Sequence, residues 1–177
     1  MKQLRIYYSA FCLLMLLPVQ TSQAAAGWGR VNMQGAVIET ACAIDTDSRD
    51  QTIDMSVLPL SQIMRDGQGG IRPFSIRLVN CVLERIDENL PQWQRFQVTF
   101  DGRMDNGLFG VDGQAQGVAL QLADSYGNII TPGMPSPSFD ITEGDRKLNY
   151  SLRLVSNQQV LRSGAYTSTI RFKMDYY

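Results

Sequence analysis

Hydrophobic and polar residues alternate with a period of two in several short segments of the chain. These segments are residues 31–37, 74–79, 96–100, 118–122, 148–154 and 166–176. Because successive side chains of a β-strand point to opposite faces, this period predicts strands with one buried face. Gly, Pro, Asn and Asp stand around many of the segments, as is typical of turns, and helical spacing is scarce. The pattern predicts a single domain, an all-β sandwich.

Three stretches depart from the alternating pattern. Residues 56–63 predict an irregular turn or a short helix, and the polar residues 83–95 predict a long loop between strands. Residues 101–107 contain acidic side chains and two glycines, but they lack the acidic closing residue of a calcium-binding loop. We therefore expect a hairpin turn there.

The first 24 residues have the features of a secretory signal peptide. Lys2 and Arg5 provide the positive start, an apolar stretch follows at residues 10–19, and small residues precede a cleavage site after Ala24. Cleavage after Ala25 or Ala26 fits nearly as well. The apolar stretch is too short to span a bilayer comfortably. The chain is therefore predicted to be exported.

Two cysteines, Cys42 and Cys81, follow the predicted signal peptide. In an exported chain such an even pair most simply forms one disulfide. The 177 residues include 16 Lys and Arg against 17 Asp and Glu, which disfavours nucleic acid as a partner. The sequence has no His, which removes most metal sites and His-based catalysis. The sequence also shows no Ser or Lys next to residues that would activate it as a nucleophile. We therefore expect no catalytic residue, no metal, no cofactor and no small-molecule substrate.

The two ends of the expected domain do not fit a closed sandwich. The strand at residues 166–176 is apolar on one face and has no following segment to cover its next edge, which is a liability for a soluble protein. Residues 27–37 are strand-like, contain several glycines and have the features of an arm. Either another chain supplies the missing strand, or the arm folds back within its own domain.

Four features together resemble a known family. The arm has a two-residue repeat and is followed by Cys42, Cys81 closes a strand-like stretch, Gly164 is fourteenth from the C-terminus, and Tyr176 is the penultimate residue. The repeat consists of Gly29, Val31, Met33, Gly35 and Val37. In this combination the chain resembles the subunits of chaperone–usher pili of the type 1 and P-pilus kind, over nearly all of its length after the signal peptide. Several stretches are most similar to the rod-terminating minor subunit of the P pilus: residues 52–55, 98–102, 113–124, 148–155 and 172–177.

The resemblance implies an incomplete immunoglobulin-like sandwich that lacks its last strand. A donor strand from another chain would complete it, first from a periplasmic chaperone and then, at the outer-membrane usher, from the arm of a neighbouring subunit. Chaperone–pilin complementation is a known example of recognition by strand addition. The resemblance also implies a donor-strand arm at residues 25–40, a pilin domain at residues 41–177, and export through the periplasm to a cell-surface pilus.

Residue roles follow from the same resemblance. The inward-facing donor positions would be Gly29, Val31, Met33, Gly35 and Val37, with polar Arg30, Asn32 and Gln34 on the opposite face. The acceptor groove and chaperone-binding strand would comprise Gly164, Tyr166, Ile170, Phe172, Met174, Tyr176 and Tyr177, with the C-terminal carboxylate docked on basic residues of the chaperone.

Alternatives stay open within and outside this family. A minor subunit that terminates or anchors the rod is the leading interpretation, with a tip-fibre adaptor or a major rod subunit as alternatives. The sequence does not tell whether the groove is blocked, as a terminator requires. Outside the family, a secreted glycan-binding module could use Trp28 and Trp93 for stacking on sugars.

Overall fold

A computed structural model describes residues 27–177, so the predicted signal peptide at residues 1–24 lies outside the described part. The chain divides into two units, Met1–Val37 and Ile38–Tyr177. Residues 27–40 contain no helix or strand, and their side chains are exposed. In the described part of the chain, no helix is long and apolar enough to cross a bilayer.

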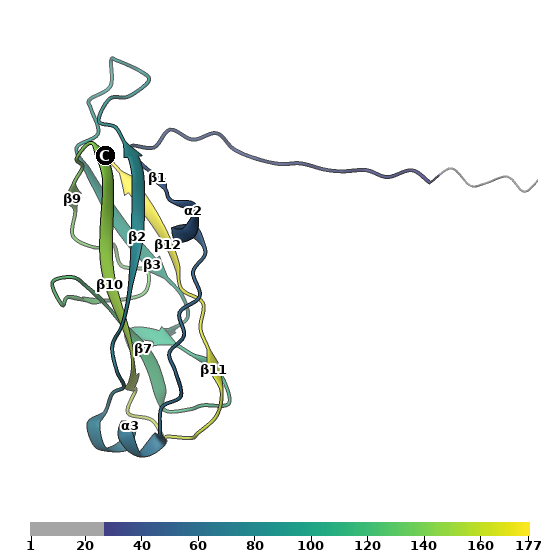
Figure 1. The fold of residues 1–177 in the computed structure, drawn as a ribbon, viewed down its shortest axis with the longest axis vertical. Helices are drawn as coiled ribbons and strands as arrows, with labels where there is room; N and C mark the ends of the chain where they lie inside the picture. The colour runs from purple at the N-terminus through teal and green to yellow at the C-terminus, as the bar shows by residue number, and fades with distance from the viewer. Residues whose placement is uncertain (1–26) are drawn as a thin grey trace, which may run out of the picture. The chain divides into compact units, whose positions relative to one another are not determined.

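The second unit contains one large antiparallel sheet with the strand order β1-β2-β10-β7-β5-β4, in which β8 also pairs with β7 (Figure 1). Its longest strand, β10, pairs with β2 on one side and with β7 on the other. The strands are β1 (Ala43–Ile44), β2 (Arg72–Cys81), β4 (Met104–Asp105), β5 (Leu108–Gly110), β7 (Val118–Asp124), β8 (Ile129–Ile130) and β10 (Gly144–Ser156).

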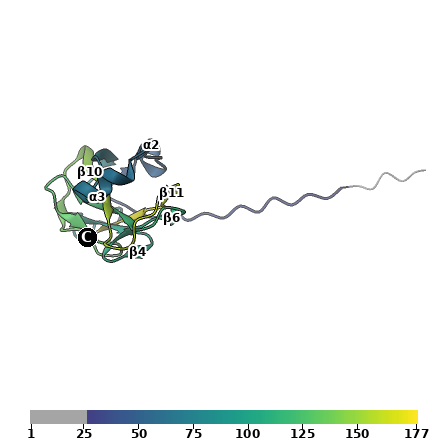
Figure 2. The same cartoon turned by 90° about the horizontal axis from the view of Figure 1, so that it is seen from below.

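A smaller sheet has the order β12-β3-β9, with β12 (Arg171–Tyr176), β3 (Arg95–Asp101) and β9 (Phe139–Asp140). A third sheet consists of β11 (Tyr166–Thr167) and β6 (Asp112–Gly113), which lie side by side in Figure 2. Two short helices, α2 (Thr46–Arg49) and α3 (Leu60–Asp66), lie between β1 and β2 in the sequence.

The hydrophobic core lies between the two larger sheets, because each contributes one apolar face. In β3, Phe96, Val98 and Phe100 are buried while the strand ends are exposed. In β10 the buried side chains are Leu148, Tyr150, Leu152, Leu154 and Val155. The rings of Phe100 and Tyr150 meet edge to face across the core, with centroids 4.9 Å apart. The all-β sandwich predicted from the period-two pattern is confirmed.

The single strand expected at residues 166–176 is wrong, because the structure divides it in two. Tyr166 and Thr167 pair with β6, whereas residues 171–176 pair with β3. Between them the Ser168 hydroxyl donates a hydrogen bond to the Gly110 carbonyl at 2.8 Å. This bond ties the connecting residues to the large sheet.

The short helix expected near residues 56–63 is α3, which begins later than its sequence pattern suggested. Pro59 precedes its first residue, and Gly67 ends it in the left-handed conformation with φ of 69°, its N–H donating to the Ile63 carbonyl at 2.9 Å. The hairpin turn expected within residues 101–107 is Asn106–Gly107, between β4 and β5. Both residues have positive φ, as a two-residue hairpin turn requires.

The predicted disulfide is confirmed: Cys42 is bonded to Cys81. It fixes the residues next to β1 to the end of β2, where the Val82 N–H also donates to the Ala41 carbonyl at 2.8 Å. This end of the sandwich is therefore covalently closed.

Candidate functional site

The last strand of the small sheet, β12, has one hydrogen-bonded edge and one free edge. It pairs with β3 alone within residues 27–177. The main-chain groups of Tyr177 and Arg95 bond to each other at 2.9 and 3.0 Å, which fixes the odd-numbered residues of β12 as those that face β3. In an antiparallel pair the alternate residues point the other way. The N–H and C=O groups of Phe172, Met174 and Tyr176 therefore face the free edge.

The side chains on this strand alternate in the same way. Arg171, Lys173 and Asp175 are exposed, whereas Phe172, Met174 and Tyr176 are half-buried against the core. The residues whose main-chain groups are free are thus the ones whose side chains point inward. An added strand could bond to these groups while it covered apolar surface.

A groove of about 1410 Å³ lies next to this strand. One wall is formed by residues 48–58 and the other by residues 162–172. The apolar side chains beneath include Phe74, Phe100, Leu120, Leu152 and Leu154. Because side chains of both the large and the small sheet line this groove, it is an opening between the two sheets of the sandwich rather than a shallow surface depression.

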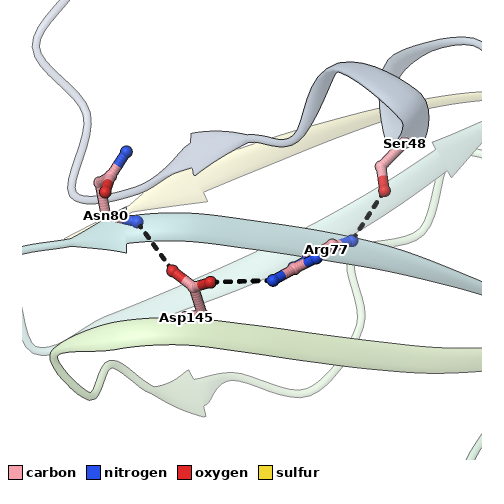
Figure 3. Close-up of polar contacts among 4 residues, drawn as sticks. All are labelled: Ser48, Arg77, Asn80 and Asp145. Atoms are coloured by element: carbon pink, nitrogen blue, oxygen red, sulfur yellow. Dashed lines mark hydrogen bonds and ion pairs between the residues drawn. The ribbon is translucent and has the colours of Figure 1, made fainter.

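The first wall is held on the edge of β2, as Figure 3 shows. The Arg77 N–H donates to the Ser48 hydroxyl at 3.0 Å, and the Asp145 carboxylate accepts from the Arg77 guanidinium at 3.1 Å and from the Asn80 N–H at 3.4 Å. Nearby, the Gln51 amide donates to the Ser75 carbonyl at 3.0 Å. The main-chain groups of this stretch of β2 are thereby used, in contrast to those of β12.

The predicted acceptor residues fall into two groups. Gly164, Tyr166, Ile170 and Phe172 line the groove. Met174 and Tyr176 lie beyond its lining residues, where the Tyr176 ring packs edge-on against Trp93 with centroids 6.0 Å apart and its hydroxyl donates to the Cys42 carbonyl at 3.4 Å. The main chain of Tyr177 continues the ladder with Arg95, and its side chain is exposed.

The acceptor groove predicted from the sequence did not include the first wall, residues 48–58. Its residues 52–55 do alternate, with Ile53 and Met55 half-buried and Thr52 and Asp54 exposed. That short alternation was the available signal, but a stretch of four residues beside an irregular helix does not identify a groove wall by itself.

Tyr166, which lines the groove, and Tyr176, which lies beyond its lining residues, both remain neutral at ordinary pH. Burial raises the pKa of the Tyr166 hydroxyl, and the nearby Asp54 carboxylate raises it further. Burial also raises the pKa of Tyr176. Both hydroxyls therefore act as neutral polar groups.

In the predicted arm, the apolar side chains are uncovered. Val31, Met33 and Val37 are 82%, 89% and 104% exposed. Added Cβ atoms at Gly29 and Gly35 would meet no atom within 4 Å. The described part of the chain contains no group of three or more Cys, Asp or Glu side chains placed to hold a metal ion.

No protein-family model matches the chain. Among curated proteins, the PRS and PAP fimbrial minor pilins of Escherichia coli are each 35% identical to it over 165 residues, which cover 92% of this chain and 85% of theirs. The chain belongs to the fimbrial pilin family. Its resemblance to pilus subunits, predicted from the sequence, is confirmed.

A solved structure agrees with the fold of this pilin. The crystal structure of the P pilus rod subunit PapA matches it with a TM-score of 0.68 at 21% identity, over 78% of this chain and all of that one. The sandwich is accordingly the immunoglobulin-like fold of pilins, which lacks its last strand. As a fimbrial pilin, the protein is a structural component of cell-surface pili.

Gly164 provides a test of how the second wall is packed. A Cβ atom there would lie 2.5 Å from the Gln114 Cβ atom and 2.7 Å from the Gln114 carbonyl carbon. Since backbone would have to move, Gly164→Val should lower the free energy of unfolding by about 1–3 kcal/mol. Urea unfolding of the pilin bound to its chaperone measures the change. Gly70→Val is the matched control, because a Cβ at Gly70 meets no atom within 4 Å. Equal midpoints for the two variants would contradict this account of the wall.

Proposed function

We propose that this pilin is a minor pilus subunit that gives the strand Gly29–Val37 to one neighbour and receives a strand in the groove beside β12. Before assembly a periplasmic chaperone fills the groove, and an outer-membrane usher is the site of exchange. The single observation that carries the proposal is the edge of β12, where the main-chain groups of the inward apolar residues lack a partner strand within residues 27–177.

The dimensions of arm and groove support strand exchange. The donor segment Gly29–Val37 and the wall segment Gly164–Phe172 each contain nine residues. An extended strand of nine residues spans about 30 Å at roughly 3.3 Å per residue, so the arm is long enough to run along the wall. Burying Val31, Met33 and Val37 contributes roughly 1.5–3 kcal/mol for each side chain, before the cost of ordering the arm.

The other predicted parts of the chain fit this role. We retain a signal peptide at residues 1–24, an arm at residues 25–40 and a pilin domain at residues 41–177. Met174, Tyr176 and Tyr177 remain proposed contacts of the chaperone, because a strand added along β12 would pass them. The function is structural rather than catalytic, in agreement with the structural pilins to which the chain is similar.

Substitutions in the arm test the donor role. Met33→Asp would place a carboxylate in the neighbour's apolar groove, where an unpaired charge is strongly disfavoured. We expect at least about a tenfold loss of the subunit from assembled pili, with chaperone binding unchanged. Immunoblots of purified pili measure incorporation. Asn32→Asp is the matched control, since its side chain would face outward. Equal incorporation of both variants would contradict the donor assignment.

A strand-exchange experiment distinguishes a subunit that accepts a neighbour's strand from a rod terminator. The complex of the pilin with its chaperone is mixed with an excess of the arm peptide of the major subunit of the same pilus, and chaperone release is followed on a native gel. Because the groove is lined along residues 162–172 on one side and 48–58 on the other, we expect the peptide to displace the chaperone. A complex that never exchanges would instead favour a rod terminator, and failure to form any chaperone complex would contradict the proposed function.

A further inference from the structure

The small sheet has a second edge, on the side of β3 away from β12. Residues 131–141, here called the proline segment, cover it, and they include Pro132, Pro135 and Pro137. The N–H groups of Gly133, Ser136 and Ile141 donate to the carbonyls of Phe100, Val98 and Gln94 at 2.8, 2.9 and 2.8 Å. Phe139 and Asp140 pair with Phe96 and Arg95 as β9. This edge of β3 is therefore used along its length.

Proline at position 135 removes a main-chain N–H from the side of the proline segment that faces away from β3. Thr99 is bridged to Pro135. Thr99 is an odd-numbered residue of β3, so its main-chain groups face β12, and its pair with Pro135 is of the non-hydrogen-bonded type. In such a pair the main-chain groups of Pro135 also point away from β3. Any other residue would present an N–H at this position, and proline presents none.

Two carbonyls of the proline segment, those of Pro137 and Asp140, are also occupied. Asp140 is paired with Arg95 in the same non-hydrogen-bonded manner, so its carbonyl points outward, and the Arg146 guanidinium donates to it. The Ser136 hydroxyl donates to the Pro137 carbonyl at 2.9 Å. The Asp140 carboxylate, 3.3 Å from the Arg95 guanidinium, adds charge to the edge. Proline and charge are both known to discourage strand addition at an edge.

We propose that the proline segment is an edge guard, which closes this side of the small sheet to strand addition and leaves β12 as the edge at which the sheet is extended. The contrast between the two edges carries the inference. Within the described residues, β12 presents main-chain groups of Phe172, Met174 and Tyr176 without a partner strand. The opposite edge lacks a donor at Pro135 and has occupied acceptors at Pro137 and Asp140. For a subunit that polymerises by strand addition, the guard would keep growth linear and prevent lateral pairing of copies.

The experiment measures self-association while β12 is covered. The full chain is purified as its complex with the chaperone, and its mass is followed by light scattering at increasing concentration. Pro135→Val restores one outward N–H in each copy, so two copies can pair edge to edge. We expect the fraction of complexes with two copies to rise about tenfold over the wild type, as two added main-chain hydrogen bonds allow. A variant whose complexes hold a single pilin copy at every concentration would overturn the proposal.

Controls separate this effect from misfolding. Pro91→Val alters an exposed proline in a loop outside the sheets and should behave as the wild type. Ser136→Ala keeps Pro135 but removes the hydroxyl that donates to Pro137 and accepts from the Val98 N–H at 3.1 Å, and it should also increase self-association. Should Pro135→Val fail to fold, Pro135→Ala and Ser136→Ala decide the matter, and single-copy complexes for both would overturn the edge guard.

Failure of the proposed function would be seen separately. If the wild-type chain forms no chaperone complex, strand complementation is wrong, whatever the edge variants do. The free full-length chains are then compared in the same light-scattering measurement, where greater self-association of Pro135→Val than of Pro91→Val supports the guard and equal self-association overturns it.

Discussion

The main-chain hydrogen bonds of β12 are the constraint on which the rest of this structure depends. Buried N–H and C=O groups need partners, and a strand that pairs on one side alone leaves half of its groups without them. In this pilin those groups belong to Phe172, Met174 and Tyr176, the inward-facing residues of the strand. In the part of the chain that the structure describes, the apolar groove therefore lies beside main-chain groups without a partner strand, and a single added strand would cover the groove and pair those groups.

The two edges of the small sheet differ for chemical reasons that lie in the sequence. The β12 edge has alternating apolar and charged residues and no proline, whereas the opposite edge is covered by a segment with three prolines. On the large sheet, side chains of Ser48 and Gln51 occupy main-chain groups of β2 beside the groove. The fold thus presents an edge that favours strand addition at β12, and the edges of β2 beside the groove and of β3 opposite β12 are already occupied.

Strands with a long, clean alternation could be predicted from the sequence, because burial of one face dominates their residue choice. β2, β3, β7 and β10 were found in this way, and the disulfide followed from export and an even pair of cysteines. The division into β11 and β12 could not be predicted, since the two strands pair with different strands far along the chain, β6 and β3. The groove wall at residues 48–58 and the role of Pro135 depend likewise on partners far along the chain, which local periodicity does not encode.

Amide hydrogen exchange along β12 tests the central claim most directly, because adjacent residues of one strand serve as controls for one another. The amides of Lys173 and Asp175 face β3 and should exchange slowly both in the free pilin and in the pilin with an added strand. Those of Phe172, Met174 and Tyr176 should exchange fast in the free pilin and become slow once the strand of a chaperone or a neighbouring subunit is bound. Slow exchange of these three amides in the free pilin, or fast exchange in the complex, would contradict the account.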